Sequence, residues 1–379
     1  MLILQRGQGA SAMDPLDGTG RSGRQAICKF SKLHVWKVTC SWKPVRCLRS
    51  CLWSTMVAMT QGGMGGRFTL SPLLGVAMTP PIDALRRGGK AALAQALARL
   101  EVAPDDLDTV ALLDDAFDQP YGQVIGLTGP PGVGKSTLIG ALIQTYRRRG
   151  RTIGIIAVDP SSRRSGGALL GDRTRLRTDP EDDGVFVRSM AARDQLGGLA
   201  EITYAAMILM RAVFDIVLVE TVGVGQSETD IAMAADTVVF CVQPGSGDSL
   251  QFMKAGIVEI PDIVTVTKGD MGKAAIRAKT DVTGAISLNL RDPDDWQVAV
   301  LTVAATTGEG VDELIATIEA HVAWLVQGDR LAVKRHDQAE AWLKQAIKER
   351  YGREGLKRLG ALSLSPGTSP FGKLAPQES

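Results

Sequence analysis

Seven short apolar runs, separated by stretches with helical spacing, limit what this chain can fold into. They occupy residues 123–128, 152–158, 184–189, 215–220, 236–242, 262–267 and 298–304. Each run is almost continuously apolar, which is typical of strands buried on both faces of a sheet. Strands that alternate with helices join through right-handed crossovers into a parallel sheet, so the pattern predicts an α/β fold. A phosphate ligand would then bind at the carboxyl ends of the strands.

A glycine-rich loop, "GPPGVGKSTL" (129–138), follows the first apolar run and leads into a helical stretch. Its spacing matches G-x-x-x-x-G-K-[ST], and strand–loop–helix is the context that this motif needs. Glycines let backbone N–H groups point at phosphate oxygens, the lysine brings a charge to the outer phosphates, and the serine hydroxyl can ligate Mg²⁺. The candidate nucleotide-binding residues here are Gly129, Pro130, Gly132, Val133, Gly134, Lys135, Ser136 and Thr137.

Carboxylates stand where apolar runs end. Asp159 closes one run, Glu220 closes another, and Asp172 lies in a loop between them. Phosphate-bound Mg²⁺ takes oxygen ligands and keeps several waters. Ser136 with these three carboxylates, some acting through water, therefore predicts a magnesium site. Each acid taken alone could instead be a helix cap or a solvated loop residue.

The stretch "TVGVGQ" (221–226) continues from Glu220 with two close glycines. We expect it to swing toward a γ-phosphate, with the N–H of Gly223 as a donor. Gln226 could orient the attacking water, as glutamine does in some GTPases, or it could only hold the loop. Asp159 is an equally open candidate for activating water. The candidate catalytic residues are Lys135, Asp159, Glu220 and Gln226.

The motif "TKGD" (267–270) ends the sixth run and fits [NT]-K-x-D. Asp270 can accept from both the ring N–H and the exocyclic amine of guanine, whereas adenine presents the opposite pattern. Thr267 and Lys268 complete the motif, and the stem of the lysine would lie along the base. Ala304 or Ala305 would give a backbone contact to the guanine oxygen. The sequence therefore predicts GTP and GDP, rather than ATP, as ligands, together with Mg²⁺.

Composition excludes several classes of function. The chain has 379 residues, 45% of them hydrophobic, and a net charge of +2. This balance predicts neither a nucleic-acid partner nor membrane insertion, and no stretch of 18 apolar residues occurs. Cys241 lies alone in an apolar run and fits a buried position in a reduced compartment. We expect a cytoplasmic location, or the mitochondrial matrix in a eukaryote.

These motifs resemble those of the MeaB/ArgK family, whose human relative is the methylmalonic aciduria type A protein. The resemblance covers about 82–350 and rests on "GPPGVGKSTL", "AVDPSS", "GGALLGDRTR", "LGGLA", "ETVGVGQSE", "QPGSGDSLQFMKAGI" and "TKGD". It implies a doubly wound, mostly parallel sheet of the P-loop NTPase type, in the SIMIBI group of GTPases that includes signal-recognition and nickel-chaperone GTPases. It also implies helical extensions at both ends.

The resemblance further implies a GTPase that acts as a chaperone of an adenosylcobalamin-dependent acyl-CoA mutase, chiefly methylmalonyl-CoA mutase. Such a chaperone gates cofactor loading and protects the mutase. The stretch "PGSGDSLQFMK" resembles the family's partner-coupling switch, with Asp248 and Lys254 at its charged positions. A homodimer is expected.

The chain departs from the family in three respects. It has Thr267 where asparagine is usual, Gly269 where alanine is common, and a short C-terminal region.

Two other functions are compatible with parts of the pattern. A nickel metallochaperone would need a His-rich or Cys motif, but the three histidines are far apart and no C-x-x-C occurs. An ATPase or kinase linked to amino-acid transport, as the ArgK name suggests, is the second. A nucleotide-gated scaffold with little hydrolysis also fits the motifs.

The predicted organisation has five parts. Residues 1–78 carry ten Lys/Arg, two acids and four of the five cysteines, and fit either a targeting segment or an upstream stretch before a true start at Met78. The parts are an unassigned basic extension (1–78), an N-terminal helical arm (79–120), the GTPase domain (121–328), a C-terminal helical arm (329–360) and a disordered tail (361–379).

Overall fold

The computed structural model of this protein divides into two compact units, Met1–Thr79 and Pro80–Ser379. The residues it describes are 10–11, 27–29, 39–40, 81–160, 178–192, 201–221, 230–245, 259–288, 292, 294–358 and 363–374. In the first unit, β1 (Ala10–Ser11), β2 (Ile27–Lys29) and β3 (Thr39–Cys40) pair antiparallel. The second unit contains the elements that the motifs predict.

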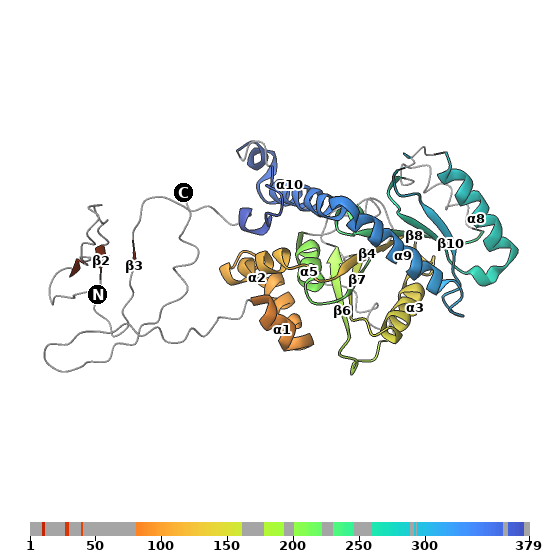
Figure 1. Cartoon of the computed structure of the whole chain (residues 1–379), viewed down its shortest axis with the longest axis horizontal. Coiled ribbons are helices and arrows are strands. Elements are labelled where there is room, and N and C mark those ends of the chain that lie inside the picture. The colour runs from red at the N-terminus through yellow and green to blue at the C-terminus, as the bar shows by residue number, and fades with distance from the viewer. Residues whose placement is uncertain are drawn as a thin grey trace, which may run out of the picture. The chain divides into compact units, whose positions relative to one another are not determined.

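The second unit is built on a seven-stranded sheet in which neighbouring strands are all parallel (Figure 1). Its order is β10-β9-β8-β4-β7-β5-β6. The strands are β4 (Gln123–Thr128), β5 (Ile153–Pro160), β6 (Val185–Ala192), β7 (Ile216–Glu220), β8 (Thr237–Val242), β9 (Ile263–Val266) and β10 (Ala299–Thr302). Each coincides with one of the seven apolar runs, so the predicted α/β fold with a parallel sheet is confirmed.

Strand β4 lies at the point where the strand order reverses. The chain leaves β4, builds β5, β6 and β7 on one side, and then crosses to build β8, β9 and β10 on the other. Connections on opposite faces diverge at such a point and leave a crevice at the carboxyl ends of the strands. The glycine-rich loop that follows β4 therefore begins at this crevice.

Helices cover both faces of the sheet. On one face, α3 (Lys135–Arg148) and α9 (Val311–Val326) pack on the apolar side chains of β4, β7 and β8. The other face is covered by α5 (Glu201–Arg211), α8 (Lys273–Ile286), the helices α1 (Pro81–Val102) and α2 (Leu107–Asp118), and part of α10 (Arg330–Arg358). Because both faces are covered, the strands are apolar on both sides, as their composition predicts.

A buried ion pair ties α10 to the start of β8. Arg335 donates from Nε and Nη2 to the two carboxylate oxygens of Asp236, at 2.8 and 2.7 Å, and also reaches the carbonyl of Gly122 at 3.1 Å. Burial by itself raises the pKa of Asp236. The hydrogen bonds and charge of Arg335, together with the charge of Arg211 and the N–H of Val124, outweigh burial and hold that pKa below its usual value. The pair joins α10 to the amino-terminal end of β8, which is the end of the strand away from the glycine-rich loop.

Replacing Arg335 by leucine should lower the free energy of unfolding by about 3 kcal/mol, because the Asp236 carboxylate would stay buried without its partner. Arg335 is 15% exposed, which places the loss at the lower end of the range for buried pairs. Urea unfolding of the full chain measures it. Lys348→Leu, at an exposed position of the same helix, is the control and should change the free energy by less than about 0.5 kcal/mol. If both changes lowered the free energy of unfolding equally, the ion pair of Arg335 and Asp236 would not contribute to stability as proposed.

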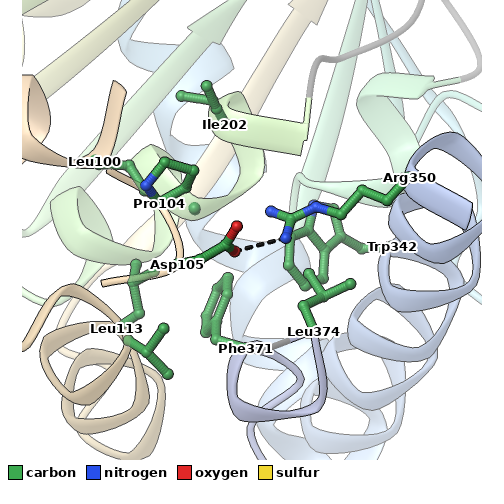
Figure 2. Close-up of a pocket in the computed structure, with 11 residues that line it drawn as sticks. Leu100, Pro104, Asp105, Leu113, Ile202, Trp342, Arg350, Phe371 and Leu374 are labelled. Atoms are coloured by element: carbon green, nitrogen blue, oxygen red, sulfur yellow. Dashed lines mark hydrogen bonds and ion pairs between the residues drawn. The ribbon is translucent and has the colours of Figure 1, made fainter. Parts of the chain in front are cut away.

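Residues 363–374 have a defined place in the structure, although composition predicts disorder over 361–379. Phe371 and Leu374 are 4% and 5% exposed. The ring of Phe371 lies 4.9 Å from that of Trp342, edge to face. Figure 2 shows both apolar residues facing a small pocket beside the ion pair of Arg350 and Asp105. Burial of these apolar side chains offsets the entropy that a Ser/Pro/Gly-rich segment loses when it is ordered.

None of the helices in the described ranges is both long and apolar enough to cross a membrane.

Candidate nucleotide-binding site

Three glycines give the loop after β4 its curled path. Gly129, Gly132 and Gly134 have φ angles of 136°, 73° and 104°, which L side chains rarely adopt. A Cβ on Gly129 would also lie 2.3 Å from the carbonyl oxygen of Cys241, so only glycine fits there. Gly134 is the N-cap of α3, and the loop therefore leads directly into the positive end of that helix.

Lys135 opens α3, and its side chain folds back over the loop. Its Nζ donates to the carbonyl oxygens of Gly129 and Pro130, at 2.7 and 3.1 Å, and the residue is 6% exposed. A primary ammonium held against this curled backbone is a compact positive charge where phosphate oxygens would lie. The role that the sequence assigns to Lys135, binding the outer phosphates, stays a prediction.

Ser136 and Glu220 lie together although 84 positions separate them in the chain. The Ser136 hydroxyl is 3.0 Å from Oε1 of Glu220, which ends β7. Beside them, the Thr221 hydroxyl donates a hydrogen bond to the Thr128 hydroxyl, with 3.0 Å between the two oxygens. This bond holds the ends of β4 and β7 together. A hydroxyl and a carboxylate are hard oxygen ligands that suit Mg²⁺.

Asp159 is a second carboxylate that the sequence assigns to the magnesium site. Asp159 lies on β5, two residues beyond Ala157, which is paired with Glu220 on β7. The backbone of Asp159 thus lies at the carboxyl ends of the strands, as Glu220 does. The side chain of Asp159 lies outside the described residues. Among the residues that are described, no three His, Cys, Asp or Glu side chains form a metal-binding group. Ser136 and Glu220 are thus the two predicted magnesium ligands whose side chains the structure describes.

Five predicted site residues belong to segments that the structure does not describe. Those that lie outside the described residues are Asp172, Gly223, Gln226, Asp248 and Lys254. Their assigned roles remain predictions.

Thr267 joins the base-reading motif to the phosphate loop. It is 4% exposed, and its hydroxyl lies 2.6 Å from the carbonyl oxygen of Val133 and 2.9 Å from that of Val242. A hydroxyl has one proton for these two acceptors, whereas an asparagine amide would have two. Thr267 thus supplies half the donor capacity of asparagine, the other residue that the [NT]-K-x-D motif allows.

Lys268 also joins the base-reading motif to the phosphate loop, from an exposed position. Its Nζ lies 3.3 Å from the carbonyl oxygen of Gly132 and 2.5 Å from Oε1 of Gln243. Gln243 follows β8, and no motif in the sequence indicates its contact with Lys268. Asp270 lies in the short turn η3 (Gly269–Met271) and is exposed, so its carboxylate is open to a base.

The loop after β10 lies against the base-reading motif. The N–H of Gly269 donates to the carbonyl of Val303 at 3.0 Å, and a Cβ on Gly269 would lie 2.9 Å from Cγ2 of Thr302. Glycine therefore permits this close approach. The N–H of Ala304 donates to the backbone carbonyl oxygen of Glu309 at 2.9 Å, so of the two predicted contacts to the guanine oxygen the geometry favours Ala305.

A doubly wound parallel sheet with a glycine-rich phosphate loop at its switch point defines a P-loop nucleoside triphosphatase, and the adjacent TKGD motif indicates a GTPase. The family described as methylmalonyl Co-A mutase-associated GTPase MeaB matches residues 93–356. This chain belongs to the MeaB family, and it is a GTPase, as the resemblance implies.

Individual proteins that are similar to this chain are consistent with the family assignment. A Pyrococcus horikoshii protein named as a GTPase is 41% identical over 270 residues, which cover 70% of this chain and 84% of that protein. The mouse methylmalonic aciduria type A homolog, named as mitochondrial, is 38% identical and is matched over 59% of this chain and 55% of its own length. The crystal structure of an LAO/AO transport system kinase has a TM-score of 0.58 at 28% identity and is matched over 76% of this chain and 92% of its own.

Proposed function

We propose that this GTPase is a chaperone of an adenosylcobalamin-dependent acyl-CoA mutase of the methylmalonyl-CoA type. It would gate the loading of the cobalamin cofactor and protect the mutase, with GTP hydrolysis as the timing step. The observation that carries the proposal is the family match over residues 93–356, because that family is described by its association with methylmalonyl-CoA mutase. The name of the mouse relative is consistent with the same setting.

The residues present suit GTP with Mg²⁺. We assign phosphate binding to the loop from Gly129 to Thr137, with Lys135 at the outer phosphates. Ser136 and Glu220 would hold Mg²⁺, with Asp159 and Asp172 nearby through water. A bound Mg²⁺ would neutralise charge on the transferred phosphoryl group. We assign base recognition to Thr267, Lys268 and Asp270, with the backbone of Ala305.

The switch residues complete the proposal. The N–H of Gly223 would contact the γ-phosphate, and Gln226 or Asp159 would orient water. Asp248 and Lys254 would carry the nucleotide state to the mutase. A loop ordered by a γ-phosphate and released on hydrolysis is a two-state element suited to such coupling. We further propose a homodimer, located in the cytoplasm or, in a eukaryotic host, in the mitochondrial matrix.

Affinity capture from the host tests the partner. Tagged full-length protein is loaded with a non-hydrolysable GTP analogue or with GDP, and bound proteins are identified by mass spectrometry. We expect a cobalamin-dependent mutase whose recovery depends on the nucleotide. Recovery of a hydrogenase or urease subunit would indicate a nickel chaperone, and recovery of an amino-acid transport component would favour the transport-linked alternative. Either of those results would overturn the proposal.

Replacing Glu220 by glutamine should raise the magnesium concentration needed for half-maximal GTP hydrolysis by about 10- to 100-fold, because the proposed metal site loses the charge of one of its oxygen ligands. The change keeps the shape of the side chain and a potential acceptor for the Ser136 hydroxyl, 3.0 Å away. Magnesium titration of turnover measures the shift. Glu319→Gln, on the exposed side of α9, is the matched control. An unchanged magnesium requirement would exclude Glu220 from the metal site.

A further inference from the structure

The side chain of Gln243 lies against the base-reading motif without belonging to it. Gln243 directly follows β8 and is half-buried. Its Oε1 lies 2.5 Å from the Nζ of Lys268, 25 residues further along the chain. A lysine ammonium can only donate, so the amide oxygen, and not the amide nitrogen, must face it.

Lys268 needs such support because its backbone is strained. Its φ angle is 53°, and within the described part of the chain only Asp329 shares a positive φ among residues other than glycine. Left-handed backbone persists in such residues only where surrounding contacts fix it. Here the ammonium is held between the carbonyl of Gly132 in the phosphate loop and the amide of Gln243 at the end of β8.

We propose that Gln243 is a positioning residue for guanine nucleotides and that it acts through Lys268. With the ammonium anchored at its tip, the four-carbon stem of Lys268 is held where it can lie along a bound base. The proposal rests on the proposed role of Lys268 in base binding. Because GDP and GTP carry the same base, Gln243 should support the binding of both equally, and should affect KM rather than kcat.

The first test is nucleotide affinity in full-length variants. Gln243→Leu removes the acceptor and should weaken both GDP and GTP binding about 3- to 10-fold while kcat changes less than about 2-fold. Gln243→Glu keeps an acceptor at the same place and should bind within about 3-fold of the unmodified protein. Preference for GTP over ITP, which lacks the exocyclic amine, should not change in either variant, since that amine is assigned to Asp270.

The second test asks whether the effect passes through Lys268. Lys268→Ala and the double variant Lys268→Ala/Gln243→Leu should bind GDP equally, because the second change has no interaction left to remove. Gln345→Leu, a half-buried glutamine bonded to Glu349 on α10, is the matched control and should bind normally. Normal affinity in Gln243→Leu, or additive losses in the double variant, would overturn the inference. Failure of the unmodified protein to bind guanine nucleotide would instead defeat the proposed base site itself.

Discussion

Replacing Lys135 by alanine is expected to lower the rate of GTP hydrolysis on the order of 10³-fold, the effect of losing one preorganised charge at a reacting group. The Lys135 ammonium is buried against the carbonyls of Gly129 and Pro130, so the fold of the loop itself fixes its position. Water would not replace it well, because a solvent dipole must reorganise during the reaction and this ammonium need not. Single-turnover hydrolysis of GTP, measured as phosphate release, gives the rate of the chemical step.

Two controls separate chemistry from folding. Lys90→Ala removes a half-buried lysine that bonds to the carbonyl of Pro180, away from the site, and should leave turnover unchanged. Because Lys135 is 6% exposed, its variant must also show an intact cooperative melting transition. A folded Lys135→Ala protein with normal turnover would exclude this lysine from the reaction.

Replacing Asp270 by asparagine is expected to weaken GTP binding on the order of 10³-fold and to create a preference for xanthosine triphosphate. A bound base would cover the Asp270 side chain, and a mismatched base would leave that covered group without its hydrogen bonds. In guanine, the ring N–H and exocyclic amine both donate to the carboxylate. Xanthine has a carbonyl in place of that amine, and an asparagine N–H can donate to it. Competition between the two nucleotides at equilibrium measures the exchange.

Asp281→Asn is the matched control for this exchange. Asp281 is exposed on α8, beyond the turn that holds Asp270, so its change should leave nucleotide preference as it was. Loss of GTP binding in Asp270→Asn without any gain for xanthosine triphosphate would mean that Asp270 supports the loop but does not read the base.

The sheet could be predicted because its signals are local. Each strand is a continuous apolar run, and burial on both faces leaves no other pattern open to it. The phosphate loop could be predicted for a similar reason, since Gly129 and Gly134 need positive φ angles that few other residues adopt. The sequence predicts the ends of strands less precisely. For example, β5 continues through Pro160, two residues beyond its apolar run.

Predictions that depended on composition were weaker. The Ser/Pro/Gly content of the C-terminal segment predicts disorder, yet Phe371 and Leu374 are buried against α2, α5 and α10. Composition measures what a segment can bury by itself. It does not register an apolar surface that helices from elsewhere in the chain provide for two or three residues.

By itself the sequence determined the parallel sheet, the phosphate loop and the guanine-type motif, because each depends on residues that are neighbours in the chain. Only the tertiary structure decided how these parts meet: Thr267 bonds to Val133 across 134 positions, Ser136 to Glu220 across 84, and Gln243 to Lys268 across 25. Such contacts follow from strand order and helix packing, which bring the carboxyl ends of β4, β7, β8 and β9 to one edge. No local pattern encodes the distance between two strand ends, so the geometry of the site had to come from the fold.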